Sequence, residues 1–177
     1  MKLLVLDGNS IVNRAYYGVR PLSTKTGIPT NAIFGFMNIM LKYIDEYKPD
    51  YLCVAFDLKA PTFRHKMYDA YKAGRKGMPE ELASQMPILK DVLSAMNIPM
   101  YEMDGWEADD LLGTISVKDT AAGWATVVVT GDKDSLQLIS ERTKVKLVST
   151  RMGQTTTKVM TEDAFREEYS TKLERKI

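Results

Sequence analysis

Cysteine and histidine are almost missing from this 177-residue chain, which contains one of each, Cys53 and His65. A single cysteine excludes a disulfide framework within the chain, and its apolar neighbours in YLCVAF predict a buried, unreactive thiol. With so few nitrogen and sulfur ligands, a zinc site built from imidazole and thiolate groups is nearly excluded. The scarcity of cysteine favours a reducing compartment, so we expect a cytoplasmic protein.

Long hydrophobic runs are absent as well. The apolar run before Asp7 is too short for a signal-peptide core, and no later run approaches the length of a membrane span, so no membrane association is expected. Neither sign of charge is in excess, since 24 Lys and Arg residues stand against 23 Asp and Glu, a net charge of +1. Only the distribution of charge along the chain can therefore point to a nucleic-acid partner.

The chain does contain an alternation of short apolar runs and amphipathic segments. Uninterrupted apolar runs end at, or one or two residues before, Asp7, Asp57 and Asp132, and such runs are typical of strands buried on both faces of a parallel sheet. Helices are predicted between and after these runs, at residues 31–47, 79–96 and 106–123. This alternation predicts an α/β fold with a mainly parallel central sheet flanked by helices on both faces.

The remaining segments predict smaller elements. NIPMYEM is expected to form a short strand, and the strand VKLVS is expected to lead into a hairpin that turns near Gly153. Thr161 then precedes an acidic first turn and is expected to cap a further helix.

Seven carboxylates lie at strand ends or open a helix, and they come from four separate segments: Asp7, Asp57, Glu107, Asp109, Asp110, Asp132 and Asp134. For each segment alone a turn or a helix cap is a sufficient explanation, and Asp134 is itself a candidate cap for SLQLI. Together they favour a shared site, because the carboxyl ends of parallel strands meet at one edge of the sheet.

Convergence of these acids has an electrostatic cost. Two like charges about 4 Å apart repel by roughly 4 kcal/mol at an effective dielectric constant near 20. Shared protons would relieve part of this repulsion, but divalent cations explain it more simply. Oxygen ligands favour Mg²⁺ or Mn²⁺, and a two-metal site supports phosphodiester cleavage.

A basic segment follows Asp57. Residues 59–76 carry six Lys and Arg residues against one Asp, a local charge of +5 with histidine neutral. If this segment is one helix, a single face presents Arg64, Tyr68, Tyr71, Lys72 and Arg75. Such a face suits phosphates and exposed bases. The alternative is a solvated helix that happens to be basic, and this alternative is less favoured beside an acidic site. For Arg14, a contact with phosphate and an ion pair with an acid are both consistent with the sequence.

Five motifs together resemble the 5′ nuclease domain of bacterial DNA polymerases I, within the flap endonuclease family. They read LLVLDGNSIVNRAYY, FDLKAPTFRHKMYDAYKAGR, MPEELASQMPILKDVLSAMNIP, GWEADDLLGTI and TGDKDSLQLI. The resemblance implies a PIN-like 5′ nuclease core over residues 1–169, with a helical arch at about 60–78 and a short charged tail at 170–177. It also implies two Mg²⁺ or Mn²⁺ ions and hydrolysis of phosphodiesters near the junction of a 5′ flap with duplex DNA or RNA–DNA, in replication and repair.

The resemblance also implies roles for individual residues. Those that match ligands of the first metal are Asp7, Asp57, Glu107 and Asp109, and those toward the second are Asp110, Asp132 and Asp134. All seven are thereby candidate catalytic residues. The residues that match DNA contacts are Arg14, Phe63, Arg64, Tyr71, Lys72 and Arg75.

The chain departs from the family at its end. Family members continue into a helix-hairpin segment that binds duplex DNA and supplies further ligands to the second metal, and nothing before Ile177 matches it. We therefore expect weak or absent flap-specific cleavage from this chain alone. One alternative is a non-catalytic nucleic-acid-binding fragment. Another is a phosphoacceptor signalling domain using Asp7 and Asp57, which the basic segment and the additional acids disfavour.

Overall fold

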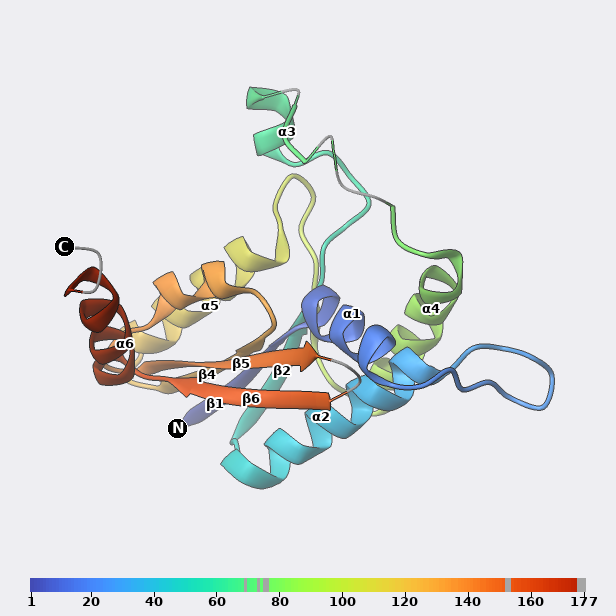
Figure 1. Cartoon of the computed structure of the whole chain (residues 1–177), viewed down its shortest axis with the longest axis horizontal. Coiled ribbons are helices and arrows are strands. Elements are labelled where there is room, and N and C mark those ends of the chain that lie inside the picture. Colours follow the sequence, from blue (N-terminus) through green and yellow to red (C-terminus); the bar gives the residue numbers. More distant parts are fainter. Residues whose placement is uncertain (69, 73, 75–76, 152–153, 175–177) are drawn as a thin grey trace.

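The computed structural model describes residues 1–68, 70–72, 74, 77–151 and 154–174. Within them, six strands form one sheet in the order β3-β2-β1-β4-β5-β6, with helices on both faces (Figure 1). Neighbouring strands are parallel except β5 and β6, which are antiparallel. The elements are β1 Lys2–Asp7, α1 Gly8–Gly18, α2 Asn31–Tyr47, β2 Tyr51–Ala55, α3 Phe63–Met67, α4 Glu80–Ala95, β3 Met100–Tyr101, α5 Ala108–Ala121, β4 Ala125–Thr130, the 3₁₀ helix η1 Lys133–Leu138, β5 Thr143–Arg151, β6 Gln154–Met160 and α6 Glu162–Glu174.

The predicted α/β class with a mainly parallel sheet is confirmed. The central strands β1, β2 and β4 each contain a run of consecutive apolar residues, because both of their faces are covered. In β1, Leu4 and Leu6 pack with α1, α2 and α4, whereas Leu3 and Val5 pack with α5 and η1 on the other face. The structure is therefore a three-layer sandwich with a hydrophobic core on each side of the sheet.

Several local expectations hold. Cys53 is a free, buried cysteine, and burial raises the pKa of its thiol to about 12, as expected for an unreactive side chain. Thr161 caps α6 by accepting a hydrogen bond from the amide of Ala164 at 3.3 Å. No helix among the described residues is long and apolar enough to cross a membrane.

The predicted boundary between core and tail does not coincide with an element end, since α6 continues past Tyr169 to Glu174. The β5–β6 hairpin is present, with Arg151 paired to Gln154, and the predicted turn at Gly153 lies outside the described residues.

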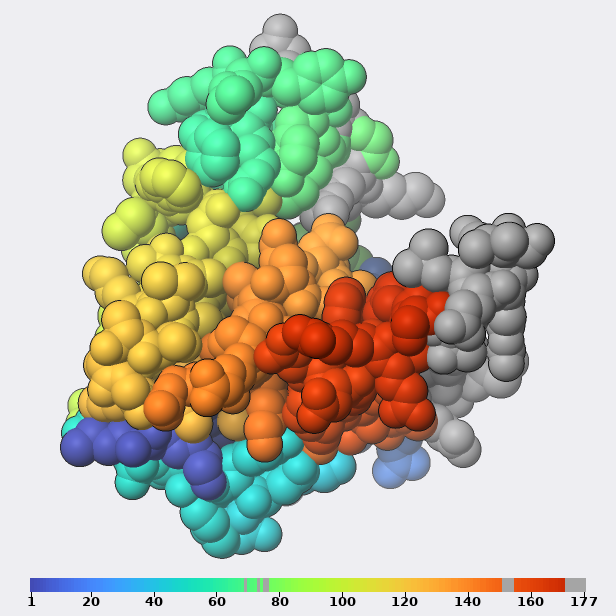
Figure 2. Space-filling view, turned by 90° about the vertical axis from the view of Figure 1, so that its left-hand side faces the viewer, coloured from blue at the N-terminus to red at the C-terminus, as the bar shows by residue number. Residues whose placement is uncertain are grey.

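The continuous basic helix predicted after Asp57 is wrong over the described residues. Only Phe63–Met67 is helical, as α3, and the chain becomes extended at Tyr68, with φ −149° and ψ 105°. Lys72 then adopts a left-handed φ of 57°, which no helix residue has. Arg64, Tyr71 and Lys72 consequently share no helix face, and Arg75 lies outside the described residues. Figure 2, which faces α5 and α6, shows the arch segment (residues 60–78) rising above both helices.

Candidate active site

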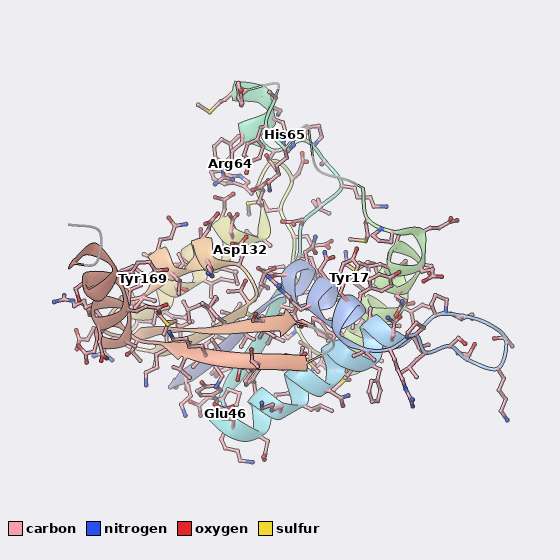
Figure 3. All side chains as sticks on the ribbon, in the orientation of Figure 1. Tyr17, Glu46, Arg64, His65, Asp132 and Tyr169 are labelled. Atoms are coloured by element: carbon pink, nitrogen blue, oxygen red, sulfur yellow. The ribbon has the colours of Figure 1, made fainter. Side chains whose placement is uncertain are left out.

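A cavity of about 710 Å³ lies beyond the carboxyl ends of β1, β2 and β4. Six of the seven candidate acids line it: Asp7, Asp57, Glu107, Asp109, Asp132 and Asp134. Three candidate DNA contacts, Arg14, Tyr71 and Lys72, line it too. Figure 3 shows Arg64 and His65 on the arch segment, above the edge of the sheet that carries Asp132. We call this the acidic cavity. Asp110 is not among its lining residues.

Asp7 ends β1 and is almost fully buried, at 7% exposure. Its carboxylate accepts hydrogen bonds from the Ser10 amide at 3.0 Å and from the Thr130 hydroxyl at 2.7 Å. Burial, with smaller contributions from the charges of Asp57 and Asp132, raises the pKa of Asp7 from 3.8 to about 6. Burial is therefore the main reason that the pKa of Asp7 is raised, and repulsion from the neighbouring acids adds to it.

Asp57 follows β2 and connects three elements. Its carboxylate accepts a hydrogen bond from the Asn9 side-chain amide at 3.0 Å, and another from the backbone amide of Ala108 at 2.6 Å. The start of α1 and the start of α5 are thereby held to the end of β2. Sequence reasoning missed Asn9 and Thr130, both of which orient acids. Their only local signal was a polar side chain within two residues of a strand-end aspartate.

Asp132 and Asp134 lie in the turn after β4. The carboxylate of Asp132 accepts a hydrogen bond from the Asp134 amide at 3.0 Å, so Asp132 caps η1. The expectation that Asp134 is the cap is therefore wrong, since the helix begins at Lys133, two residues earlier than a cap at Asp134 implies. The Thr130 hydroxyl also accepts a hydrogen bond from the Asp132 amide at 3.0 Å and thereby joins this turn to Asp7.

Gly131 provides the space for Arg14. The guanidinium of Arg14 donates a hydrogen bond to the Gly131 carbonyl at 2.9 Å, and a Cβ at residue 131 would lie 2.5 Å from Arg14 Nε. The Gly131 amide meanwhile donates to the Ser10 hydroxyl at 2.8 Å. The Arg14 guanidinium thus binds a backbone oxygen at the border of the acidic cavity.

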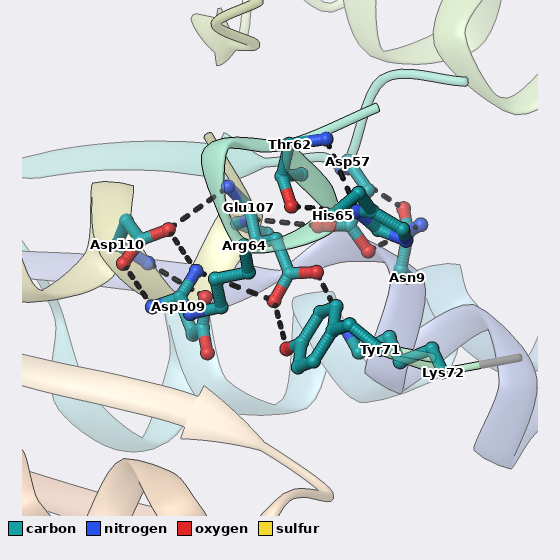
Figure 4. Close-up of polar contacts among 11 residues, drawn as sticks. Asn9, Asp57, Thr62, Arg64, His65, Tyr71, Lys72, Glu107, Asp109 and Asp110 are labelled. Carbon is teal, nitrogen blue, oxygen red and sulfur yellow. Dashed lines mark hydrogen bonds and ion pairs between the residues drawn. The ribbon is translucent and has the colours of Figure 1, made fainter. Parts of the chain in front are cut away.

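The arch segment contacts the acids directly (Figure 4). Lys72 Nζ lies 2.6 Å from one oxygen of Glu107, and the Tyr71 hydroxyl donates to the other at 3.0 Å. Arg64 forms two hydrogen bonds of 2.7 Å with the two oxygens of Asp110. This contact, more than any other, lowers the pKa of Asp110, whereas burial, followed by the charges of Asp110 and Glu107, raises the pKa of Asp109. Predicted DNA contacts therefore pair with predicted metal ligands.

The donor set of the acidic cavity fits hard divalent cations, because every acidic donor is a carboxylate oxygen. A cation would also relieve the repulsion that acts on Asp7. In the part of the chain that is described, however, no three acidic side chains are arranged as a ready metal-binding group. Glu107, for example, has both carboxylate oxygens engaged by Tyr71 and Lys72.

Comparison with known proteins identifies relatives along almost the whole chain. The model of a family described as "5'-3' exonuclease, N-terminal resolvase-like domain" matches residues 2–170. The chain is 44% identical to DNA polymerase I of Caldicellulosiruptor bescii, over 96% of this chain and 20% of the relative. It is 41% identical to a 5'-3' exonuclease of Aquifex aeolicus, over 81% of this chain and 50% of that protein. The solved structure of T5 5'-exonuclease with bound zinc has a TM-score of 0.70 at 19% identity, covering 96% of this chain and 61% of that one.

The chain shares its α/β fold, with a mainly parallel sheet, with T5 5'-exonuclease. The chain belongs to the 5′-3′ exonuclease family, within which residues 2–170 form the N-terminal resolvase-like domain. It spans about a fifth of the length of the DNA polymerase I relatives.

Proposed function

We propose that this chain is the core of a divalent-metal-dependent 5′ nuclease that hydrolyses phosphodiester bonds of DNA near 5′-flap junctions. Mg²⁺ or Mn²⁺ are the proposed ions, since carboxylates are their preferred protein ligands. An RNA–DNA primer is a substrate of the same chemistry. The observation that carries the proposal is the acidic cavity itself, in which six carboxylates stand beside the cationic side chains of Arg14 and Lys72.

The proposed metal ligands are the six carboxylates that line the cavity: Asp7, Asp57, Glu107, Asp109, Asp132 and Asp134. Divalent ions held there would supply Lewis-acid stabilisation to a reacting phosphodiester. Thr130 holds the orientation of Asp7, and Asn9 holds that of Asp57, so these ligands need little reorganisation.

The cations at the rim have a separate proposed role. An acidic cavity repels a phosphodiester, and Arg14 and Lys72 offset this repulsion at the two sides of the cavity, one from α1 and one from the arch segment. Tyr71 adds an aromatic ring on which an unpaired base can stack. The cavity thus combines cationic side chains that can bind phosphate with carboxylates that can bind metal ions, and a nuclease site needs both.

The proposal is tested with a 5′-labelled flap substrate in Mg²⁺ or Mn²⁺. We expect metal-dependent cleavage by the wild-type chain and at least a hundredfold slower cleavage after Asp7→Ala or Asp132→Ala, comparable to the loss of a principal electrostatic stabiliser. Circular dichroism of each variant serves as the folding control. Cleavage at the wild-type rate by both variants would overturn the assignment of the site.

The same assay decides the main alternative. Retention of the flap substrate without product, in both ions, would indicate a nucleic-acid-binding fragment without catalysis. The salt dependence of retention then locates the contact, because Lys72→Ala removes one phosphate-directed cation and should flatten the salt slope by about one unit.

A further inference from the structure

Among the seven candidate acids, Asp110 is the one that forms a bidentate pair with an arginine. Its Oδ1 accepts a hydrogen bond from Arg64 Nη2 at 2.7 Å. Its Oδ2 accepts one from Arg64 Nη1 at 2.7 Å and a second from the Glu107 amide at 3.0 Å. Both oxygens are therefore engaged by strong donors, in the bidentate geometry that a guanidinium and a carboxylate form.

Asp110 also lies apart from the acidic cavity. Neither it nor Arg64 lines that cavity, whereas its neighbour Asp109 does. The two aspartates are adjacent in α5, and successive helix residues point about 100° apart, so they face different surroundings. Asp109 lines the cavity, whereas Asp110 pairs with Arg64 of the arch segment (Figure 4).

The Arg64–Asp110 pair belongs to a larger contact between the arch segment and the loop before α5. The amide of Phe63 donates a hydrogen bond to the Gly105 carbonyl at 2.9 Å, and the ring of Phe63 lies 5.0 Å from that of Trp106. Arg64 also stacks over the Phe63 ring, with 4.6 Å between its guanidinium carbon and the ring centre. The helix α3 has no buried side chain of its own, so its position depends on these contacts.

We infer that Asp110 is a positioning residue, which anchors the arch segment through Arg64 and does not hold a metal ion. The inference rests on the proposed metal site, because it removes one acid from that site and gives it another task. It also assigns Arg64 to the fold of the arch segment and away from direct DNA contact. Lys72 and Tyr71, which do line the cavity, are left as the arch residues nearest the substrate.

The test uses Trp106 as a reporter of arch docking. Trp124 is first replaced by phenylalanine, so that Trp106 is the one tryptophan, and Asp110→Asn, Arg64→Gln and their combination are made in that background. Asn keeps an acceptor for the Glu107 amide while it removes the charge that binds Arg64. Acrylamide quenching reports the exposure of Trp106, and the electron paramagnetic resonance signal of free Mn²⁺ reports metal affinity without any catalysis.

We expect each single variant to raise the quenching constant about twofold and the double variant to raise it no further, since the two residues act as one unit. Affinity for Mn²⁺ should stay within about threefold of the parent after Asp110→Asn, and fall at least about tenfold after the matched change Asp109→Asn. Lys66→Gln, an exposed change on the same helix, should alter neither signal.

Two results would overturn the inference. One is a tenfold loss of Mn²⁺ affinity after Asp110→Asn that Arg64→Gln does not share, which would make Asp110 a ligand. The other is a quenching constant of the double variant that rises by the product of the two single-variant increases, which would mean that Arg64 and Asp110 act independently. If Asp109→Asn leaves Mn²⁺ affinity unchanged, the proposed metal site is wrong. The quenching constants of the parent, the two single variants and the double variant still decide whether Asp110 anchors the arch segment.

Discussion

Asp7, Glu107 and Asp132 each occupy the N-cap position of a helix and also line the acidic cavity. A helix cap and a metal ligand are usually treated as competing explanations of a strand-end aspartate. Here the two are compatible, because a helix that starts beside the sheet edge points its first amides toward the same space. The local pattern correctly predicted the cap at Thr161, but it could not distinguish Asp109 from Asp110.

At Asp7 the raised pKa predicts a measurable effect of pH on stability. The folded protein holds this proton more tightly than the unfolded chain, so the stabilisation is complete below pH 4 and is lost as pH rises through about 6. In metal-free buffer, Asp7→Asn should therefore gain stability relative to wild type by roughly 2 kcal/mol between pH 4.5 and pH 7.

Urea unfolding at the two pH values measures this difference. The exposed change Asp91→Asn in α4 serves as the control and should show no comparable trend. If the free energies of unfolding of Asp7→Asn and wild type differ by the same amount at both pH values, the charge of Asp7 is not destabilising in the folded state.

The absence of a side chain at Gly131 is predicted to affect the affinity for DNA and not the affinity for metal ions. The Cβ of Gly131→Ala would lie 2.5 Å from Arg14 Nε, so the guanidinium has to leave the Gly131 carbonyl. DNA affinity should fall by roughly the tenfold that one charge-assisted hydrogen bond is worth, while Mn²⁺ affinity is retained. Gly113→Ala is the matched control, since its Cβ meets only Leu138 at 3.4 Å. Equal DNA binding by both variants would contradict a role for the position of Arg14.

Among the elements, the strands were the most predictable and the arch segment the least. A strand buried on both faces needs an apolar residue at every position, so the runs before Asp7, Asp57 and Asp132 located β1, β2 and β4 directly. The arch segment has no such requirement. Its backbone follows contacts made by Arg64, Tyr71 and Lys72 with acids 35 to 46 residues further along the chain, which no local periodicity encodes.

The contact between the arch segment and Glu107 predicts competition with metal ions. Lys72 occupies one oxygen of Glu107, and an ion has to displace it. Lys72→Ala should therefore raise Mn²⁺ affinity about fivefold, the equivalent of roughly 1 kcal/mol for a partly exposed ion pair, although the same change weakens DNA binding.

Isothermal titration with Mn²⁺ measures the first effect and a filter-binding assay the second. Lys66→Ala, on the exposed face of α3, is the control for loss of a positive charge from the arch segment. Unchanged or weaker Mn²⁺ binding by Lys72→Ala would mean that Lys72 does not compete with the ion.

For the whole molecule, the acidic cavity lies where the order of the strands turns. The chain builds β1, β2 and β3 in one direction and then returns to place β4 on the other side of β1. A cavity at such a switch point is bordered by loops from both halves of the sheet, which is why one ligand set can include Asp57 and Asp132. The sequence predicted this convergence from strand ends, whereas the distances within it depended on packing of the complete fold.

An ion that joins both halves of the sheet should stabilise the entire fold. Mn²⁺ at a hundred times its dissociation constant contributes about 2.7 kcal/mol if it binds only the folded state. For a chain of this size the melting temperature should rise by roughly 5 to 10 °C. Differential scanning fluorimetry with Mn²⁺ measures the shift, which Asp132→Asn should abolish. An equal shift in that variant would place the ion elsewhere.

The central position of β1 has a consequence for the time course of synthesis. Its first neighbour, β2, begins at Tyr51, but its second, β4, is complete only at Thr130. A ribosome therefore releases the middle strand of the sheet long before the partner that covers its other edge, and pairing across such a separation is slow. Asp7 and Asp132 become neighbours in the same step that closes the sheet. The nascent protein thus acquires the acidic cavity and its folded stability as one late event.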